Sequence, residues 1–292
     1  MPVIKERKPS WLKVKLPSSQ GYFELKKLVD KQKLNTICED SLCPNIAECW
    51  QKKHLTFMIL GDICTRSCSF CSVKSGRPKT LPDPDEPRRV AESIAKIGLK
   101  YAVVTSVNRD DIPDGGASHF AELIVRVRDL SPQTKMEVLI PDLMGDLNAL
   151  KLVWDAKPDV LSHNVECVKN LQIVVRSKAN WERSLMILEQ TRKNTNGIKV
   201  KTGIQVGHGE TWDELLDALD ELAKIGIEIL TIGQYLKPTK FHRDIKKYYT
   251  PDEFQKLYTE AKSRGIRFVF SGPLVRSSYR AGEVFEENRS GI

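Results

Sequence analysis

Six of the seven cysteines in this chain lie between Cys38 and Cys71. Cys64, Cys68 and Cys71 have the spacing C-x3-C-x2-C, and an aromatic residue, Phe70, precedes the last of them. Three thiolates on one short loop can hold three corners of a four-iron cluster, which leaves the fourth iron without a protein ligand. An open coordination position is where a metal site carries out chemistry. The spacing therefore predicts a fold that presents an iron–sulfur cluster to a small molecule.

A second cysteine trio precedes the first. Cys38, Cys43 and Cys49 have the spacing C-x4-C-x5-C. Structural zinc is the plainer interpretation, but zinc sites usually pair one C-x2-C with another or with histidines, and only His54 lies nearby. Six thiolates could in principle share one cluster, yet the two separate spacings favour two clusters. The seventh cysteine, Cys167, has no partner spacing and is expected to be a small buried group.

Composition restricts the class of protein. The 292 residues are 40% hydrophobic and 29% charged, which is typical of a soluble globular protein. We expect no membrane span, because no run of 18 apolar residues occurs, and no secretory signal at the start. Clustered cysteines in odd number argue against disulfides and favour a reducing cytoplasm. The net charge of +8 suits an acidic partner, but without a long Lys/Arg run we expect no nucleic acid.

The middle of the chain alternates between strand-like and helix-like patterns. Apolar runs predict strands at residues 56–61, 101–106, 135–141, 160–163, 198–206 and 227–233. Helical periodicity predicts helices at residues 86–97, 118–130, 145–154, 180–195, 211–225 and 250–263. Alternating units of this kind favour a parallel sheet, and six of them make about three-quarters of a TIM-type barrel. The cluster loop follows the first strand, at the strand end where such barrels carry their sites.

Nearly the whole chain resembles the lipoyl synthases, radical S-adenosylmethionine (SAM) enzymes with iron–sulfur clusters. The matching segments outside the cysteine trios include Lys8-Pro-Ser-Trp-Leu-Lys-Val-Lys-Leu-Pro17, Tyr101-Ala-Val-Val-Thr-Ser-Val-Asn-Arg-Asp-Asp111, Pro113-Asp-Gly-Gly116, His163-Asn-Val-Glu166, Thr231-Ile-Gly-Gln-Tyr-Leu236 and Arg276-Ser-Ser-Tyr279. The resemblance implies an α/β fold, a partial (βα)6 TIM-type barrel with an N-terminal cluster-binding extension and a C-terminal tail. The expected segments are residues 1–52, 53–270 and 271–292.

The resemblance also implies two 4Fe-4S clusters and their roles. The open iron at Cys64, Cys68 and Cys71 binds SAM, and one-electron reduction yields a 5′-deoxyadenosyl radical. That radical removes hydrogen from C6 and C8 of an octanoyl group on a carrier lysine. Sulfur comes from the auxiliary cluster of the other trio, for which Ser278 is the fourth ligand. An alternative is another radical SAM sulfur transferase, of the biotin synthase or methylthiotransferase type; a zinc-binding nucleic-acid protein belongs to a different class.

The expected SAM contacts share a place at a strand end or beside the cluster loop: Phe70, Ser106, Asn164, Glu166, Arg176 and Gly203. Five of the six have a plainer alternative, which is core packing for Phe70, a solvated loop for Asn164 and Glu166, a bond to its own backbone for Ser106 and an exposed position for Arg176. The sequence departs from the family pattern in two of these places. Val175-Arg-Ser-Lys-Ala179 replaces Val-Arg-Pro-Gly-Ala, and Lys201-Thr202-Gly203 replaces Lys-Ser-Gly.

The resemblance further implies partners. These are octanoylated lipoyl carrier domains, an electron donor such as ferredoxin or flavodoxin, and an iron–sulfur carrier that rebuilds the auxiliary cluster.

Overall fold

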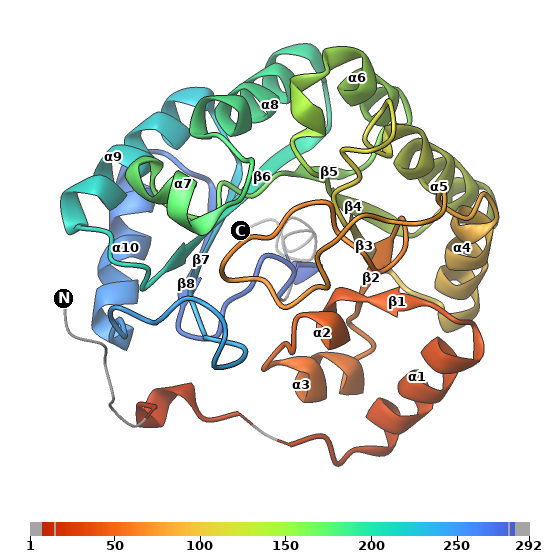
Figure 1. Cartoon of the computed structure of the whole chain (residues 1–292), viewed down its shortest axis with the longest axis horizontal. Helices are drawn as coiled ribbons and strands as arrows, with labels where there is room; N and C mark the ends of the chain where they lie inside the picture. The colour runs from red at the N-terminus through yellow and green to blue at the C-terminus, as the bar shows by residue number, and fades with distance from the viewer. Residues whose placement is uncertain (1–7, 15, 280, 284–292) are drawn as a thin grey trace. The chain divides into compact units, whose positions relative to one another are not determined.

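The computed structural model describes residues 8–14, 16–279 and 281–283, so the first seven residues, where a secretory signal would begin, lie outside it. The chain is α/β, and its strands are hydrogen-bonded neighbours in sequence order from β1 to β8 (Figure 1). It divides into two compact units. The N-half unit contains residues 15–65, 73–161 and 278–292, and the C-half unit contains residues 1–14, 66–72 and 162–277.

The N-half unit carries the N-terminal cysteine trio, Cys38, Cys43 and Cys49, and the first parallel strands. Its elements in chain order are α1 (Gln20–Lys31), β1 (Asn35–Thr36), α2 (Ile37–Asp40), α3 (Ile46–Gln51), β2 (Thr56–Ile59), α4 (Glu86–Ile97), β3 (Tyr101–Ser106), α5 (Ala117–Leu130), β4 (Lys135–Leu139), η2 (Leu143–Gly145) and α6 (Leu147–Asp155). Strands β2, β3 and β4 are parallel, with Ile59 opposite Ser106 and Thr105 opposite Leu139. Strand β1 pairs antiparallel with β2.

The C-half unit continues the alternation. Its elements are η1 (Ser10–Leu12), η3 (Lys169–Leu171), α7 (Gln172–Val175), α8 (Trp181–Asn194), β6 (Lys199–Val206), α9 (Trp212–Ile225), β7 (Ile229–Gln234), α10 (Pro251–Ser263) and β8 (Phe268–Gly272). Strand β5 (Val160–Ser162) ends where this unit begins. Strands β6, β7 and β8 are parallel, with Gly203 opposite Thr231.

The six predicted strands are present as β2 to β7, and the six predicted helices as α4, α5, α6, α8, α9 and α10. The expected α/β fold with a mostly parallel sheet is confirmed. Strands β1 and β8 were not predicted. None of the described helices is both long enough and apolar enough to cross a membrane.

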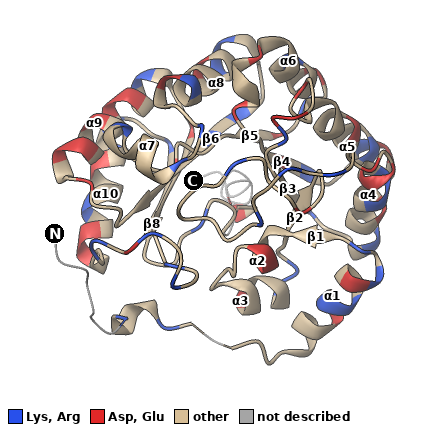
Figure 2. Ribbon diagram, in the orientation of Figure 1, with Lys and Arg blue, Asp and Glu red and all other residues tan. Residues whose placement is uncertain are grey.

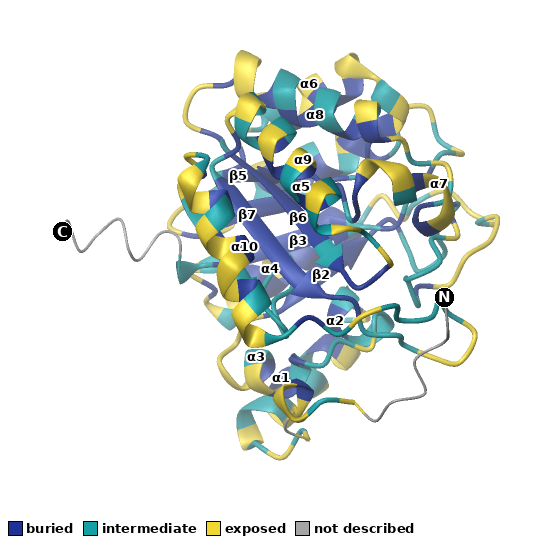
Figure 3. Cartoon of the chain, turned by 90° about the vertical axis from the view of Figure 1, so that its left-hand side faces the viewer, coloured by how far each residue is buried: buried dark blue, intermediate teal, exposed yellow. Residues whose placement is uncertain are grey.

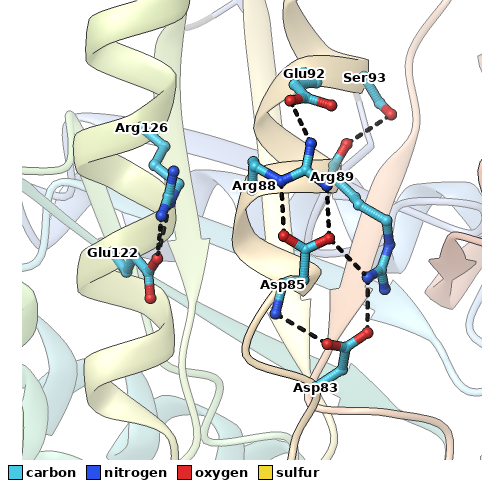
Figure 4. A network of polar contacts seen from close by, with 8 residues as sticks. All are labelled: Asp83, Asp85, Arg88, Arg89, Glu92, Ser93, Glu122 and Arg126. Carbon is cyan, nitrogen blue, oxygen red and sulfur yellow. Dashed lines mark hydrogen bonds and ion pairs between the residues drawn. The ribbon is translucent and has the colours of Figure 1, made fainter.

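Helix surfaces and strands differ in burial and charge. Acidic and basic residues are interspersed along the helices (Figure 2). Most residues of β2 to β7 are buried, whereas helices alternate between buried and exposed residues (Figure 3). On α4, for example, Arg88 donates to Asp85 and Glu92 at 2.6 Å each, and Arg89 donates to Asp83 at 2.7 Å (Figure 4). These pairs are solvent-exposed, so we expect them to add little stability.

The C-terminal end of strand β2 is held in place by a buried carboxylate and a glycine. Glu86, at the start of α4, accepts the backbone N–H of Leu60 at 2.7 Å and is itself buried. Leu60 has a positive φ of 71°, and the Leu60 side chain packs directly on Gly116. A Cβ at Gly116 would lie 2.2 Å from Leu60 Cδ1, so only glycine fits there. These contacts set the path of the chain from β2 into the cysteine loop.

Candidate functional site

In the N-half unit, the N-terminal cysteine trio occupies two short helices and the turn between them. Cys38 is in α2 and Cys49 in α3, while Cys43 lies in the turn and donates its backbone N–H to the Cys38 carbonyl at 3.0 Å. Burial, followed by the neighbouring Cys43 thiolate, raises the pKa of Cys38 to about 11. Burial, Cys43 and Cys38 together raise the pKa of Cys49 to about 12. Repulsion from Cys43 thus adds to burial in raising the pKa of both Cys38 and Cys49.

The C-terminal tail contacts the helix that carries Cys49. The Tyr279 hydroxyl donates to a Glu48 carboxylate oxygen at 3.4 Å. Ser278, the residue before Tyr279, lies in a turn whose carbonyl accepts the Ala281 N–H at 3.4 Å. The residue next to Ser278 thus contacts the residue next to Cys49. The role of Ser278 as a ligand stays a prediction.

Cys64 is held at the parallel-strand ends of the N-half unit. Its backbone N–H donates to Lys74 at 2.8 Å, and its carbonyl accepts the Gly76 N–H at 2.9 Å. Its sulfur atom accepts from Asn108, both from the backbone nitrogen at 3.3 Å and from Nδ2 at 3.7 Å. Asn108 follows β3 by two residues, so both groups lie beyond the ends of paired strands.

The second part of the cysteine loop, residues 66–72, belongs to the C-half unit. Ser69 donates its backbone N–H to Val175 at 2.9 Å, and its carbonyl accepts the Arg243 N–H at 3.0 Å. A ring nitrogen of His242 lies 3.0 Å from the Cys71 carbonyl oxygen. Backbone contacts of Ser69 and Cys71 therefore hold the loop that carries Cys68 and Cys71.

The donor chemistry of both trios fits iron–sulfur clusters. All seven cysteines lie in the described residues as thiols without disulfide bonds. Within those residues, no group of three or more His, Cys, Asp or Glu side chains is arranged around a single metal ion. Thiolates of a cubane bind separate irons, so they do not need the close grouping of ligands around one ion.

A polar cluster follows β5 in the C-half unit. The Glu166 carboxylate accepts Asn164 Nδ2 at 3.0 Å and Gln205 Nε2 at 2.7 Å. The Glu166 backbone bonds to Gly203 and Gln205 of β6, which extends the parallel pairing beyond β5. Glu166 has a positive φ of 65°, and this backbone conformation is uncommon for a residue other than glycine. The strand end is thus built around this carboxylate.

Comparisons with known proteins identify the family. The radical SAM superfamily model matches residues 58–222. A lipoyl synthase of Symbiobacterium thermophilum is 52% identical over 277 residues, which is 95% of this chain and 86% of the relative. The chain belongs to the lipoyl synthase family.

Solved structures agree on the fold. SuiB of Streptococcus suis bound to S-adenosylmethionine aligns with a TM-score of 0.57 at 12% identity, covering 87% of this chain. HydG, a maturase of the [FeFe]-hydrogenase, also gives 0.57 at 13% identity over 73% of this chain. The chain spans a little over half of SuiB, 56%, and half of HydG, 50%. The predicted radical SAM fold of a lipoyl synthase family member is confirmed.

Several buried polar atoms fit a bound ligand of the kind that the family uses. Among the described residues, Ser106 Oγ and Asn164 Oδ1 are buried and have no hydrogen-bond partner. Burying such a group unpaired costs about 1–3 kcal/mol, so a ligand that pairs it recovers that energy. Both residues are predicted SAM contacts. At Gly203, a Cβ would lie only 2.9 Å from Asn164 Oδ1, so glycine keeps the space beside that oxygen open.

Arg176 is buried, so the alternative of an exposed position for it is wrong. Its Nη1 donates to the Val165 carbonyl at 3.2 Å, to Gln172 at 3.3 Å and to Ser184 Oγ at 3.0 Å. Lys178 stands where the family pattern has glycine, and it has a positive φ of 61°. The loop therefore turns at this position without a glycine. The contact of Arg176 with SAM stays a prediction. Cys167 is buried, as expected.

His208 is a residue that the sequence interpretation missed. It is fully buried, its ring stacks on Tyr235 at 4.4 Å between centroids, and neither ring nitrogen has a hydrogen-bond partner in the described structure. Burial, together with the positive charge of Arg243, lowers the pKa of His208 to about 3. The Phe70 ring lies 6.3 Å from the His208 ring. The Gly-His-Gly sequence at residues 207–209 was the available signal.

Proposed function

We propose that this chain is a lipoyl synthase that inserts two sulfur atoms, at C6 and C8, into an octanoyl group carried on a protein lysine. The observation that supports this most directly is the contact of Tyr279 with Glu48. It brings the serine-bearing tail of a lipoyl synthase family chain to the helix of its N-terminal cysteine trio. Alkyl C–H bonds offer no acidic proton, so side-chain acids and bases cannot start this reaction.

Two 4Fe-4S clusters are part of the proposal. Cys64, Cys68 and Cys71 would hold one cluster with an open iron, and the N-terminal trio with Ser278 would hold the other. When bound, the first cluster with SAM supplies a radical that removes hydrogen, and the second supplies sulfur. Serine oxygen is a poorer match than thiolate for soft, sulfide-bound iron. An iron held by Ser278 should therefore be released more easily, which suits a cluster that is taken apart.

The chain's own residues bind and orient SAM in this proposal. Ser106 Oγ and Asn164 Oδ1 provide the buried polar atoms that a ligand would pair. Glu166 holds Asn164 in position and faces the ribose hydroxyls, while Gly203 leaves room for the ligand. Phe70 packs on the adenine, and Arg176 pairs with the carboxylate of the methionyl group.

We also propose the partners and the three chain segments that the family resemblance implied. The substrate is an octanoylated carrier domain, and a ferredoxin or flavodoxin supplies electrons. An iron–sulfur carrier rebuilds the auxiliary cluster. Residues 1–52 and 271–292 supply that cluster's ligands, and residues 53–270 form the radical SAM barrel.

Anaerobic turnover tests the function. Reconstituted protein, SAM, a reductant and an octanoylated carrier peptide should yield a peptide with two added sulfur atoms by mass spectrometry. Iron analysis should find about eight irons per chain, four for each cluster. A single sulfur atom, or a methylthio product, would favour the other sulfur transferases.

Two substitutions test the sulfur source. Ser278→Ala and Cys43→Ala should still cleave SAM but release no lipoyl product, because only the second cluster is lost. Ser277→Ala and Cys167→Ala are matched controls that change the same residue types outside the proposed ligand set, and they should make product. Full lipoyl formation by Ser278→Ala would contradict the assignment of the sulfur donor.

A further inference from the structure

The Cys64 sulfur atom receives two hydrogen bonds from a residue elsewhere in its unit. Asn108 donates to this sulfur with its backbone N–H at 3.3 Å and with its side-chain Nδ2 at 3.7 Å. The two residues are 44 positions apart, and both lie in the N-half unit. The register of β2 and β3, with Ile59 opposite Ser106, brings them to the same edge of the sheet.

The backbone around Asn108 is fixed before any ligand binds. Its carbonyl oxygen accepts the Thr65 backbone N–H at 2.9 Å and the Thr65 hydroxyl at 3.0 Å. The same hydroxyl accepts the Asp110 N–H at 3.1 Å. The next residue, Arg109, is buried, pairs with Asp111 at 2.8 Å and donates to the Leu60 carbonyl at 3.3 Å. The donors that face Cys64 are therefore preorganised, and little freedom is lost when they act.

The orientation of the Asn108 amide is informative. Its Nδ2 faces the sulfur, while Oδ1 is buried without a partner in the described structure. Turning the amide over would place the carbonyl oxygen against the electron-rich sulfur. The arrangement thus favours the donor side toward Cys64, although an unpaired buried oxygen is itself unfavourable.

We infer that Asn108 is a positioning residue that raises the reduction potential of the cluster held through Cys64. This inference rests on the proposed function, because it requires a cluster at Cys64, Cys68 and Cys71. Hydrogen bonds to cluster sulfurs are one of the levers by which proteins set these potentials. Reduction adds negative charge to the cluster, and N–H dipoles aimed at a ligand sulfur stabilise that charge. Asn108 therefore makes the cluster easier to reduce and affects how readily SAM is cleaved.

The side-chain contribution can be removed while the backbone donor stays. Asn108→Leu has nearly the same size and no donor, and Asn108→Asp keeps the shape but places an acceptor, with negative charge, beside the sulfur. Both are made in a chain with Cys38, Cys43 and Cys49 changed to Ala, which leaves one cluster to observe. The midpoint potential is measured anaerobically by redox titration followed by electron paramagnetic resonance.

We expect a more negative midpoint potential for Asn108→Leu and a still more negative one for Asn108→Asp. Asn194→Leu, at an exposed asparagine of α8, should leave the potential unchanged. A second readout covers variants that bind iron poorly. In protein whose asparagines carry ¹⁵N only at the side-chain amide, pulsed electron paramagnetic resonance of the reduced cluster should detect a coupled nitrogen when Asn108 is present. This coupling is lost in Asn108→Leu.

The outcomes separate the two claims. Iron-loaded Asn108→Leu with an unchanged potential would overturn the inference and leave the proposed function standing. The absence of ¹⁵N coupling in the parent chain would do the same. If the parent chain with only Cys64, Cys68 and Cys71 binds no iron, the proposed function fails and the inference fails with it.

Discussion

Gly203 shows how a single missing methyl group can keep a binding position open. Built on this residue, a Cβ would lie 2.8 Å from Thr231 Oγ1 and 2.9 Å from Asn164 Oδ1. Real Cβ atoms essentially never approach so closely, so Asn164 would have to move. The side chain that would move carries the unpaired oxygen that we assign to SAM.

We therefore predict that Gly203→Ala weakens SAM binding by about tenfold or more, or at least about 1.4 kcal/mol. Equilibrium dialysis of SAM with the cluster-loaded protein measures this. Gly272→Ala is the control in the same unit, because its Cβ would meet Val275 at an ordinary 3.4 Å and should not change binding. Equal SAM affinity in Gly203→Ala and the parent protein would exclude Asn164 from the SAM site.

At the scale of single elements, helix caps explain why several predicted boundaries agree with the structure. The sequence predicted a helix at residues 250–263, and α10 runs from Pro251 to Ser263. Thr250 caps it in a capping box with Glu253, in which each side chain bonds the other residue's backbone. Signals of this kind are local, so they can be read from neighbouring residues alone.

We predict that Thr250→Ala destabilises the protein by about 1 kcal/mol, within the usual range for loss of an N-cap. Thr259→Ala is the matched control on the same helix. The Thr259 hydroxyl bonds only the Gln255 carbonyl one turn earlier and is exposed, so its loss should change stability by less than about 0.5 kcal/mol. Urea-unfolding midpoints compare the two variants. A control variant as unstable as Thr250→Ala would contradict the capping argument.

The elements that sequence interpretation missed are short or lack a repeating pattern. Strand β1 has two residues, and its pairing with β2 depends on contacts across the sheet rather than on its own sequence. Strand β8, at Phe268–Gly272, has one buried residue in five, so it lacks the long apolar run that revealed β2 to β7. The partners of Arg176 could not be predicted for a related reason, because its contacts come from α7 and α8.

The residues of the candidate site also differ in whether the sequence alone could reveal them. Spacing and family resemblance predicted both cysteine trios and the tail, because ligands that are close in sequence form a pattern that can be recognised locally. The hydrogen bonds from Asn108 to Cys64 and the burial of His208 depend on how strands and loops meet. No local pattern could give them, although the sequence predicted both the cluster loop and Ser106 at strand ends.

At the scale of the whole molecule, one buried histidine affects the stability of the folded chain against acid. The imidazole of His208 stays neutral in the folded protein until pH falls to about 3, whereas an unfolded chain protonates it near its ordinary pKa of 6.5. The unfolded state therefore gains protons first as pH falls. The contribution of buried, neutral His208 to the free energy of unfolding is fully present above about pH 6.5. It is lost progressively as the pH drops toward 3.

We predict that between pH 7 and pH 5 the parent protein loses about 2 kcal/mol more stability than His208→Phe, which cannot bind a proton. Phenylalanine should keep the stacking on Tyr235. Denaturant unfolding at both pH values, with the exposed His54→Phe as control, measures the difference. The idea fails if the two proteins lose the same stability.

The raised thiol pKa values of Cys38 and Cys49 have a consequence for the protein between turnovers. Oxidants and electrophiles attack thiolates rather than thiols. Because both groups stay protonated near neutral pH, the Cys38 and Cys49 thiols are poor targets for oxidants and electrophiles while no iron is bound to them. In the proposed cluster site, iron displaces the protons of both thiols.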